Sequence, residues 1–449
     1  MAIGSLQVRV LRGNVEAPVD NAKIVVSQHT SEGTRQTEQQ LITDSSGLSG
    51  IVELDAPEKE FSQTPSNTRP YSTCDIRVSA EGYEDFEIKG TQILPDTLSL
   101  QDVRLRSTNQ RRQNEEQTDE DIIVIPEAVL FGDYPVKIPE DPVKPLPSPT
   151  GGVVLQKPVV PQYIVVHLGA PNDTSVPNVT VNFADYIKNV CSSEIYATWP
   201  ETAIRANIYC ITSFALNRIY TEWYRNQGKN FQVTNHTAYD QAFFYGRNIY
   251  ANISRLVDEL FTTYVQRQGQ KQPLLTQYVD GVRVVRDGWF SQWGSKYLAD
   301  SGKFPYEILT HYYGTDINLV RAEKVVGIPQ SFPGYALRIG SSGQPVRTVQ
   351  TFLNRIAVNF PAIPKLAVTG VYDAKTATSV KKFQEVFKLS QSGIVDYATW
   401  FAISRLYVAV TKIAELREED LRASLNGLFV PPIVGDYDGY LPVIDYPTN

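Results

Sequence analysis

The sequence predicts a multidomain α+β protein, and three observations lead to that expectation. Short runs of alternating apolar and polar residues fill residues 1–107, long helical segments follow, and a compact helical unit with glycine-rich turns comes later. A chain of 449 residues has length for several domains. We therefore expect an N-terminal antiparallel β-sandwich, a mainly helical domain and a small three-helix module, in that order.

The β-sandwich is expected over residues 1–107. Its candidate strands include the runs LQVRVL, AKIVVS and DIRVSA, with turn-rich pieces such as TDSSGLSG between strands. Residues 108–158 then combine a charged run with the proline-rich tail PVKPLPSPTGG. No helical or strand period is sustained there, so this stretch is predicted to be an exposed linker.

The remaining chain is predicted to be mainly helical. After a strand in QYIVVHLG, residues 159–325 contain long helical patterns such as PETAIRANIYCITSFALNRIYTEWYRN. Residues 336–405 contain three short helices joined by glycine-rich turns, which predicts a separate small module. Residues 406–449 are expected to form one more helix and a tail rich in Pro and Tyr.

Charge and composition exclude several classes of partner. The net charge of −7 and the lack of a Lys and Arg cluster disfavour nucleic acid, because phosphate binding needs concentrated positive charge. No apolar run approaches the roughly 20 residues that span a bilayer, and the N-terminus lacks the pattern of a standard secretory signal. We expect no membrane span and synthesis without standard export.

Cysteines and histidines indicate neither a disulfide framework nor a metal site. Cys74, Cys191 and Cys210 form no paired-thiol motif, so buried free thiols are expected. The four histidines are scattered, and no pair has the spacing that places two imidazoles on one metal. We therefore expect no metal and no other cofactor, which disfavours a zinc hydrolase.

Glu194 is the carboxylate that the pattern sets apart. In a helix over FADYIKNVCSSEI it shares the apolar face with Ile187, Val190 and Cys191. Burial and the negative end of the helix both favour the protonated form, and a raised pKa suits a general acid. The structural alternative is that Glu194 caps a backbone group or pairs with Arg205.

Glu201 has a structural explanation instead. The segment TWPE, from Thr198 to Glu201, fits a capping box at the start of the next helix.

The segment YIKNVCSSEIYATWPETAIRANIYCITSFALNRIY resembles the SpoIID-type lytic transglycosylase family, in which a Glu precedes a P-x-x-A-x-x-A helix. Two further matches follow in order, TAYDQAFFYGRN and SQWGSKYLADSGKFPYEILTHYYG. The later stretches LRIGSSGQPVRTVQTFL, TGVYDAKTATSVKKFQ and SGIVDYATWFAI resemble the peptidoglycan-binding type 1 module. As a whole, the chain is similar to the SleC-type spore cortex-lytic enzymes.

The resemblance implies a lytic transglycosylase that cleaves the bond between N-acetylmuramic acid and N-acetylglucosamine. Glu194 would protonate the glycosidic oxygen and then accept the proton of the muramic C6 hydroxyl, which leaves a 1,6-anhydro end. Substrate positioning is implied for Gln241, Tyr245, Ser291 and Gln292 by their places in the matched motifs. Because the nucleophile belongs to the substrate, one protein carboxyl group is enough.

The resemblance also implies a zymogen that acts on spore cortex peptidoglycan during germination. The first 107 residues would be a prodomain, and a subtilisin-like germination protease would cut the linker near PSPTGGVVLQKP. The implied location is the spore cortex or coat region, after synthesis in the mother cell.

Three other functions remain open. A hydrolytic muramidase would use Asp240 or Glu222 as a second carboxylate. A peptide-stem amidase is disfavoured because metal ligands do not cluster and no Cys–His arrangement is evident. The non-enzyme alternative is a structural protein that binds peptidoglycan through the third unit, since a fold does not guarantee activity.

Overall fold

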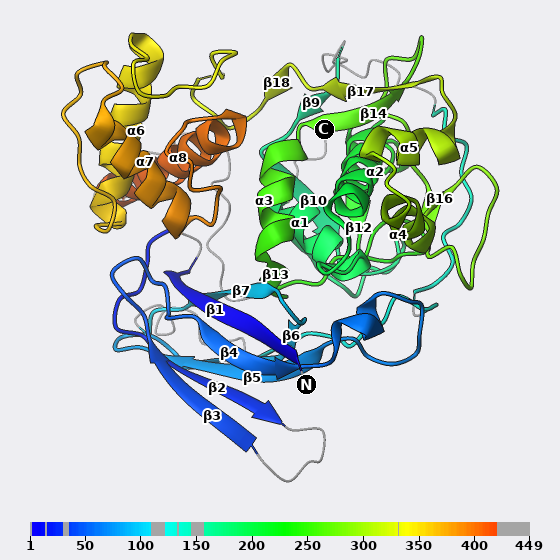
Figure 1. Cartoon of the computed structure of the whole chain (residues 1–449), viewed down its shortest axis with the longest axis horizontal. Helices are drawn as coiled ribbons and strands as arrows, with labels where there is room; N and C mark the ends of the chain where they lie inside the picture. The colour runs from blue at the N-terminus through cyan, green and yellow to red at the C-terminus, as the bar shows by residue number, and fades with distance from the viewer. Residues whose placement is uncertain are drawn as a thin grey trace.

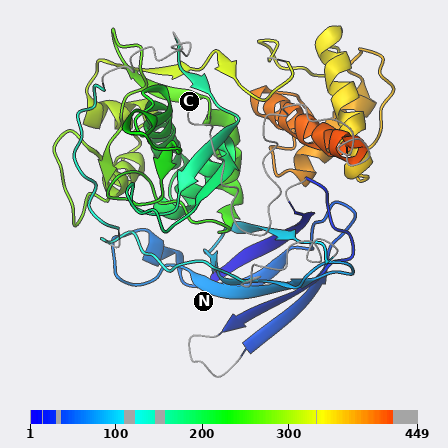
Figure 2. The same ribbon diagram turned by 180° about the vertical axis from the view of Figure 1, so that it is seen from behind.

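A computed structural model of the chain has three lobes (Figures 1 and 2). It describes residues 2–13, 16–29, 36–108, 122–132, 134–144, 157–330 and 332–419. Two β-sheets form the N-terminal lobe, drawn in blue, and the middle of the chain forms a mainly helical lobe, drawn in green. The third lobe is helical and is drawn in yellow and orange. The protein is thus a mixed α+β molecule, as the sequence predicts.

Two sheets pack on each other in the N-terminal lobe. The first has the strand order β13 (Ile249–Tyr250), β7 (Leu98–Leu105), β1 (Ala2–Arg12) and β4 (Val52–Ala56). The second has the order β3 (Gln36–Ile42), β2 (Lys23–His29), β5 (Ser72–Ser79), β6 (Phe86–Ile93) and β8 (Ile122–Val124). A short 3₁₀ helix, η1 (Lys59–Ser62), precedes β5.

The core of this lobe follows from strand alternation. Inward residues such as Val8 of β1, Val26 of β2 and Ile76 of β5 are fully buried in one cluster, because every second side chain faces the other sheet. The expectation of purely antiparallel pairing is wrong. β1 pairs with β7 in parallel, and so does β6 with β8, because these partners are joined by long crossings rather than by hairpins.

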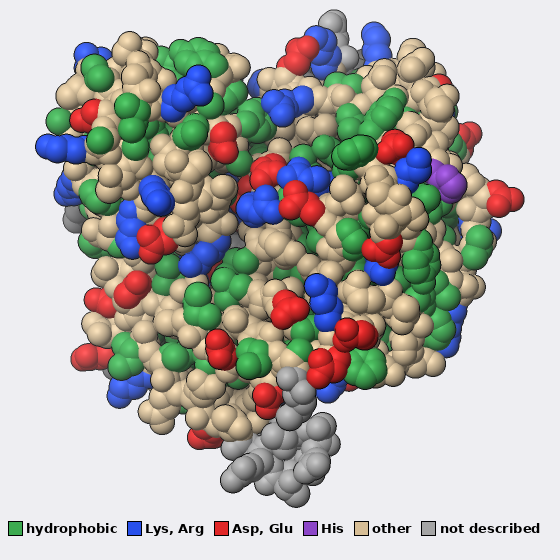
Figure 3. Space-filling model, viewed as in Figure 1, with side chains coloured by type: hydrophobic (Ala, Val, Ile, Leu, Met, Phe, Trp, Pro, Cys, Tyr) green, Lys and Arg blue, Asp and Glu red, His purple; other side chains and the backbone are tan. Residues whose placement is uncertain are grey.

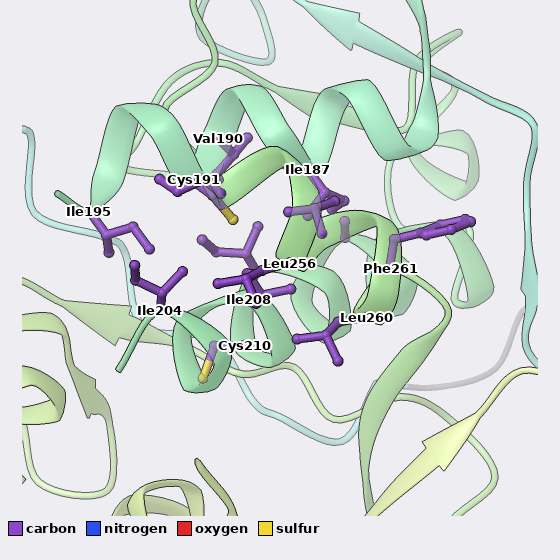
Figure 4. Close-up of a cluster of buried hydrophobic side chains, with 14 of the residues drawn as sticks. Ile187, Val190, Cys191, Ile195, Ile204, Ile208, Cys210, Leu256, Leu260 and Phe261 are labelled. Atoms are coloured by element: carbon purple, nitrogen blue, oxygen red, sulfur yellow. The ribbon is translucent and has the colours of Figure 1, made fainter. Parts of the chain in front are cut away.

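The middle lobe contains five α-helices. They are α1 (Phe183–Glu194), α2 (Glu201–Tyr220), α3 (Ala251–Leu260), α4 (Gln292–Asp300) and α5 (Pro305–Tyr313), with the 3₁₀ helix η2 (Arg225–Gln227) after α2. Asn182 begins α1 by accepting a hydrogen bond from the amide of Ala184 at 3.1 Å. Apolar side chains of α1, α2 and α3 meet in the core of this lobe (Figure 4).

Small sheets frame these helices. One contains β11 (Asn178–Asn182), β10 (Tyr163–His167) and β12 (Val233–Thr234). Three strand pairs complete the set: β14 (Thr263–Arg267) with β17 (Ile317–Arg321), β15 (Tyr278–Val279) with β16 (Phe290–Ser291), and β9 (Val159–Val160) with β18 (Lys324–Val325). The pairing of β15 with β16 brings residues 278 and 292 to one side of the lobe.

The third lobe is a three-helix module. It contains α6 (Gln344–Asn359), α7 (Ala374–Val386) and α8 (Tyr397–Glu419), which enclose a core that includes Phe383 and Trp400. A separate helix after residue 405 was expected, but α8 continues through that point. No glycine or proline interrupts residues 397–419, so nothing local ends the helix.

Specific contacts join the lobes. Asn248 and Gln92 form two hydrogen bonds, of 3.1 and 2.9 Å, between the middle and N-terminal lobes. β13 of the middle lobe also pairs with β7 of the N-terminal lobe. On the other side, Arg405 of α8 pairs with Asp185 of α1 at 3.0 Å.

The predicted exposed linker is partly wrong. Residues 122–124 form β8, and residues 126–132 and 134–144, called the strap below, run over the middle lobe. Leu130 is 5% exposed and Lys137 is 6% exposed, so these two residues are packed, whereas Val136, Ile138 and Val143 of the strap are exposed, as the sequence predicts. Local period could not predict this burial, because it comes from contacts with distant residues. Residues 145–156, which contain most of the predicted cleavage region, lie outside the described residues.

Other expectations concern charge, thiols and metals. The three cysteines are free and buried, as predicted. On the face seen in Figure 3, basic and acidic side chains are interspersed. No helix within the described ranges is long and apolar enough to cross a membrane. Within the same ranges, His, Cys, Asp and Glu side chains form no cluster of three or more that could hold a metal ion.

Candidate functional site

Glu194 is the last residue of α1, and its side chain is inside the middle lobe. Only 2% of the residue is exposed. The predicted apolar face is buried, and so is most of the opposite, polar face, including Lys188 and Asn189. Lys188 is neutralised there by Asp258, 2.8 Å away. Apart from Asp185, the helix that carries Glu194 is therefore buried on all sides.

Three donors hold the carboxyl group of Glu194. The backbone amide of Ala242 donates to Oε1 at 2.7 Å. The side-chain amide of Gln292 donates to Oε2 at 3.3 Å and to the backbone carbonyl of Glu194 at 3.1 Å. The hydroxyl of Tyr278 makes a further hydrogen bond to the carboxyl group. These contacts fix both the position and the orientation of the carboxyl oxygens.

Gln241 does not contact the carboxyl group itself but binds Tyr278, which does. Its Nε2 donates to the hydroxyl oxygen of Tyr278 at 3.1 Å and to the carbonyl of Ile211 at 3.2 Å. Its Oε1 accepts from the hydroxyl of Tyr186 at 3.0 Å. Gln241 is fully buried. The amide therefore orients Tyr278, which in turn contacts Glu194.

Burial raises the pKa of Glu194 above its ordinary value. The ammonium group of Lys137 and the hydrogen bonds from Tyr278 and Ala242 act in the opposite direction, but they do not cancel the effect of burial. A carboxyl group that keeps its proton nearer to neutral pH can act as a general acid.

The strap covers this carboxyl group. Residues of the strap line a small pocket together with Glu194, Tyr278 and Gln292. The open space left in that pocket is about 50 Å³, which holds a few water molecules but no sugar ring. In the full chain, residues 129–132 and 134–137 thus line the site beside Glu194 and leave only a small, partly open pocket there.

Backbone and side-chain contacts fix the strap in this place. The amide of Leu130 donates to the hydroxyl of Tyr196 at 2.9 Å, and its carbonyl accepts from the indole of Trp293 at 2.6 Å. The hydroxyl of Tyr134 donates to the carbonyl of Ser193 at 2.9 Å, next to Glu194. The strap therefore binds residues on both sides of Glu194 in the chain, Ser193 and Tyr196.

Lys137 is the strap residue whose charge acts on Glu194. Its Nζ donates to the backbone carbonyl of Asp240 and lies 4.5 Å from the ring centre of Tyr278. Burial lowers the pKa of Lys137 to about 8, although Glu194 and Asp240 favour the charged form. A buried cation thus lies in the pocket over the candidate acid.

Of the predicted positioning residues, the structure brings Gln292 and Gln241 to Glu194. Ser291 instead begins α4, where its hydroxyl accepts from the amide of Gly294 at 2.8 Å. Tyr245 is half-buried on the side near Arg104 and Arg106 of the N-terminal lobe. Neither Ser291 nor Tyr245 is among the described residues that line the pocket.

The structural alternatives for this region also have clear outcomes. Glu194 does bind a backbone group, the amide of Ala242, as one alternative held. Arg205, the partner in the other alternative, pairs with Glu201 and Glu259 instead. The predicted capping box is wrong, because α2 begins at Glu201 with Pro200 as its N-cap, and no side chain caps the helix. The hydroxyl of Thr198 instead contacts that of Ser62 in the N-terminal lobe at 2.6 Å.

The two candidate second carboxylates have other partners. Asp240 is fully buried, and its oxygens accept hydrogen bonds from Arg218, Tyr224 and Thr234. Glu222 lies in the turn after α2 and is 3.7 Å from Arg225. Asp280, which sequence reasoning did not single out, lines the pocket with Glu194.

Several residues of the site were missed by sequence reasoning. Tyr278, Lys137 and Asp280 come from segments 57 to 86 residues away from Glu194 in the chain. Tyr278 is one of 25 tyrosines, and its neighbours form no motif that distinguishes it. Ala242 contributes only its backbone amide, which no sequence pattern reports. Only the fold brings these groups together.

Comparison with known families identifies the third lobe. Residues 342–403 match the model of a peptidoglycan binding domain. The match falls within the predicted unit of residues 336–405 and contains α6, α7 and the start of α8. Comparison with curated proteins gives no match. The chain therefore carries a peptidoglycan-binding domain, which associates it with the cell wall and its glycan.

Proposed function

We propose that the protein is a lytic transglycosylase of spore cortex peptidoglycan, with Glu194 as its single acid and base. The observation that carries the proposal is the carboxyl group of Glu194, which is buried, has a raised pKa and is oriented by Ala242, Gln292 and Tyr278. The peptidoglycan-binding domain supports the substrate class.

In the proposed reaction, Glu194 first gives its proton to the glycosidic oxygen as the bond from that oxygen to muramic C1 breaks. The C6 hydroxyl of the same muramic residue then forms a bond to C1, and its proton returns to the Glu194 carboxylate. The products are a free hydroxyl on N-acetylglucosamine and a 1,6-anhydro-muramic end, with no water consumed. Ala242, Gln292 and Tyr278 keep the carboxyl group in place during both transfers.

We further propose that the full chain is an inactive zymogen. The pocket that Glu194 and the strap line has a cavity volume of about 50 Å³. A glycan strand can therefore reach the carboxyl group only if the strap moves. A subtilisin-like germination protease acting within residues 145–158 would separate the strap from the middle lobe. The N-terminal lobe would then act as the prodomain, made in the mother cell and active in the cortex or coat region of the spore.

The test uses a full-length chain with a site for a sequence-specific protease inserted within residues 145–156. Cut and uncut protein are incubated with cortex peptidoglycan, and the glycan fragments are identified by mass spectrometry. We expect anhydro-muramic ends from cut protein only, and none from cut Glu194→Gln. Glu201→Gln is the matched control, because Glu201 pairs with Arg205 on the surface. Equal products from cut Glu194→Gln and cut wild type would contradict the proposal.

Asp280 supports one second candidate, hydrolysis of the same bond. It lines the pocket with Glu194, and a hydrolase needs a second carboxylate to activate water. Its Oδ1 already accepts hydrogen bonds from the backbone amides of residues 282, 283 and 284, at 2.7 to 3.1 Å. These bonds give Asp280 a structural role in the turn. Reducing muramic ends that disappear in Asp280→Asn would favour hydrolysis. Glycan binding without any cleavage would favour a purely structural protein.

A further inference from the structure

The strap residue Glu140 is bound as a ligand would be. Its carboxylate accepts two hydrogen bonds from the terminal nitrogens of Arg218, at 2.8 and 2.6 Å. This is the paired geometry with which arginine recognises carboxylates. The side chain of Arg218 is fully buried, and that of Glu140 is 15% exposed.

The main chain of Glu140 is bound as well. The side-chain amide of Gln277 accepts from the Glu140 amide at 2.8 Å and donates to the Glu140 carbonyl at 2.7 Å. Two residues earlier, the amide of Ile138 donates to the carbonyl of Ala238 at 2.7 Å. Arg218, Gln277 and Ala238 therefore contact the backbone of the strap and one acidic side chain at the same time.

Residues outside the strap fix the position of the Arg218 side chain. Its Nε donates to Asp240 at 2.7 Å, and one terminal nitrogen also donates to the carbonyl of Tyr239 at 2.9 Å. The rings of Phe214 and Trp223 lie 4.9 and 5.4 Å from its guanidinium carbon. Asp240 uses one edge of the guanidinium group, so the end that binds Glu140 is available when the strap moves.

The contacts of Lys137 show where Arg218 lies relative to Glu194. Lys137 lines the pocket over Glu194 and donates to the carbonyl of Asp240, whose side chain binds Arg218. Glu140 follows Lys137 by three positions in the strap. Arg218 thus lies next to the pocket of the candidate acid, linked to Lys137 through Asp240.

We propose that Arg218 and Gln277 form a subsite for a carboxylate-bearing peptide, and that Glu140 of the strap occupies this subsite in the full chain. The inference rests on the proposed function for its ligand, which is the acidic peptide attached to the muramic residue. Arg218 binds the carboxylate of the peptide, and Gln277 binds the amide and carbonyl next to it.

The test measures binding and needs no catalysis. It uses the full-length chain with the inserted protease site, cut so that Glu140 to Lys144 form a free end of the strap. The variants are Glu140→Gln and the matched control Asp141→Asn, which removes the same charge from a side chain that bonds within the strap. The probes are the tripeptide L-alanyl-γ-D-glutamyl-diaminopimelate, the same tripeptide with its carboxyl groups amidated, and N-acetylmuramic acid.

Calorimetry should find that the acidic tripeptide binds Glu140→Gln at least about tenfold more tightly than it binds Asp141→Asn, because only Glu140 competes for Arg218. The amidated tripeptide should show no such difference. Arg218→Lys in the Glu140→Gln background should remove the preference for the acid, since lysine lacks the two-pronged geometry.

Several binding results would overturn the subsite. Equal affinity in Glu140→Gln and Asp141→Asn, equal binding of acid and amide, or no binding at all means that Glu140 is only an anchor of the strap. Preference for N-acetylmuramic acid over the tripeptide would assign the carboxylate to the sugar and contradict the peptide subsite. If the tripeptide binds but the glycan is not cleaved, the enzymatic proposal fails and the subsite remains.

Discussion

Lys137 and Glu194 line the same pocket, and the ammonium group of the first holds the pKa of the second lower than burial alone would. The two residues are 57 positions apart in the chain and belong to different structural units. The strap thus does more than fill space, because it places a cation beside the candidate acid. Displacement of the strap removes both the cover and the charge.

Lys137→Met in the full chain should raise the pKa of Glu194 further, because burial remains while the opposing cation is lost. The pKa can be measured by NMR titration of labelled glutamate side chains, with Glu194→Gln used to assign the signal. Lys144→Met is the control, because Lys144 belongs to the same strap but pairs with Glu140. An unchanged Glu194 titration in Lys137→Met would contradict the assigned interaction.

Glu194 should also make stability depend on pH. Its pKa is raised in the folded protein, so its proton stabilises the fold fully below pH 4.5, the unfolded value, and this contribution is lost as pH rises through the folded pKa. Glu194→Gln cannot titrate. The free energy of unfolding of the wild type, measured in urea, should therefore fall relative to Glu194→Gln as pH rises through that window.

Glu201→Gln provides a control of opposite sign. Burial opposes the charged form of Glu201, but hydrogen bonds from Arg205 and Arg255 lower its pKa overall. Its contribution is present above the unfolded value and is lost as pH falls through the folded pKa. If both variants changed the pH profile in the same direction, the assigned pKa shift of Glu194 would be wrong.

Gln292→Leu should weaken activity of the cut protein more than it weakens the fold. The substitution removes the two donor contacts to Glu194, and a lost hydrogen bond to a buried polar group costs about 1–3 kcal/mol. Ser291→Ala loses the cap of α4 instead, at a cost of about 1 kcal/mol in stability. Cleavage rates and urea unfolding of both variants distinguish the two roles, and equal activity in both would remove Gln292 from the site.

Leu130→Asp should open the strap in the uncut chain. The side chain of Leu130 is buried in the same cluster as Tyr196 and Trp293, and an unpaired carboxylate there costs several kcal/mol. The uncut variant should release glycan fragments at a rate above that of the uncut wild type. Val136→Asp is the control, because Val136 belongs to the strap but is 45% exposed. Equal inactivity of both uncut variants would argue against inhibition by the strap.

Some parts of this account could be predicted from the sequence and others could not. The period of residues 183–195 predicted helix α1 and the burial of Glu194, because helical spacing decides which side chains share a face. Glycine-rich turns and periodicity likewise predicted the three-helix module, whose residues 342–403 match a peptidoglycan binding domain.

The parts that the sequence did not predict depend on contacts between distant residues. The strap has no period of its own, and its burial comes from partners such as Tyr196 and Trp293. The capping box failed because Pro200, not Thr198, is the N-cap of α2, and the hydroxyl of Thr198 contacts Ser62, 136 residues away. The parallel pairing of β1 with β7 and the contribution of β13 to the same sheet are also long-range choices.

The most direct test of the central claim is cleavage of cortex peptidoglycan by the cut protein in water enriched in ¹⁸O, followed by mass spectrometry of the muramic ends. Intramolecular attack by the C6 hydroxyl uses no water, so the account predicts anhydro ends that carry no ¹⁸O and that require Glu194. Muramic ends that carry one ¹⁸O atom would show that water attacks C1, and would contradict a transglycosylase with a single carboxyl group.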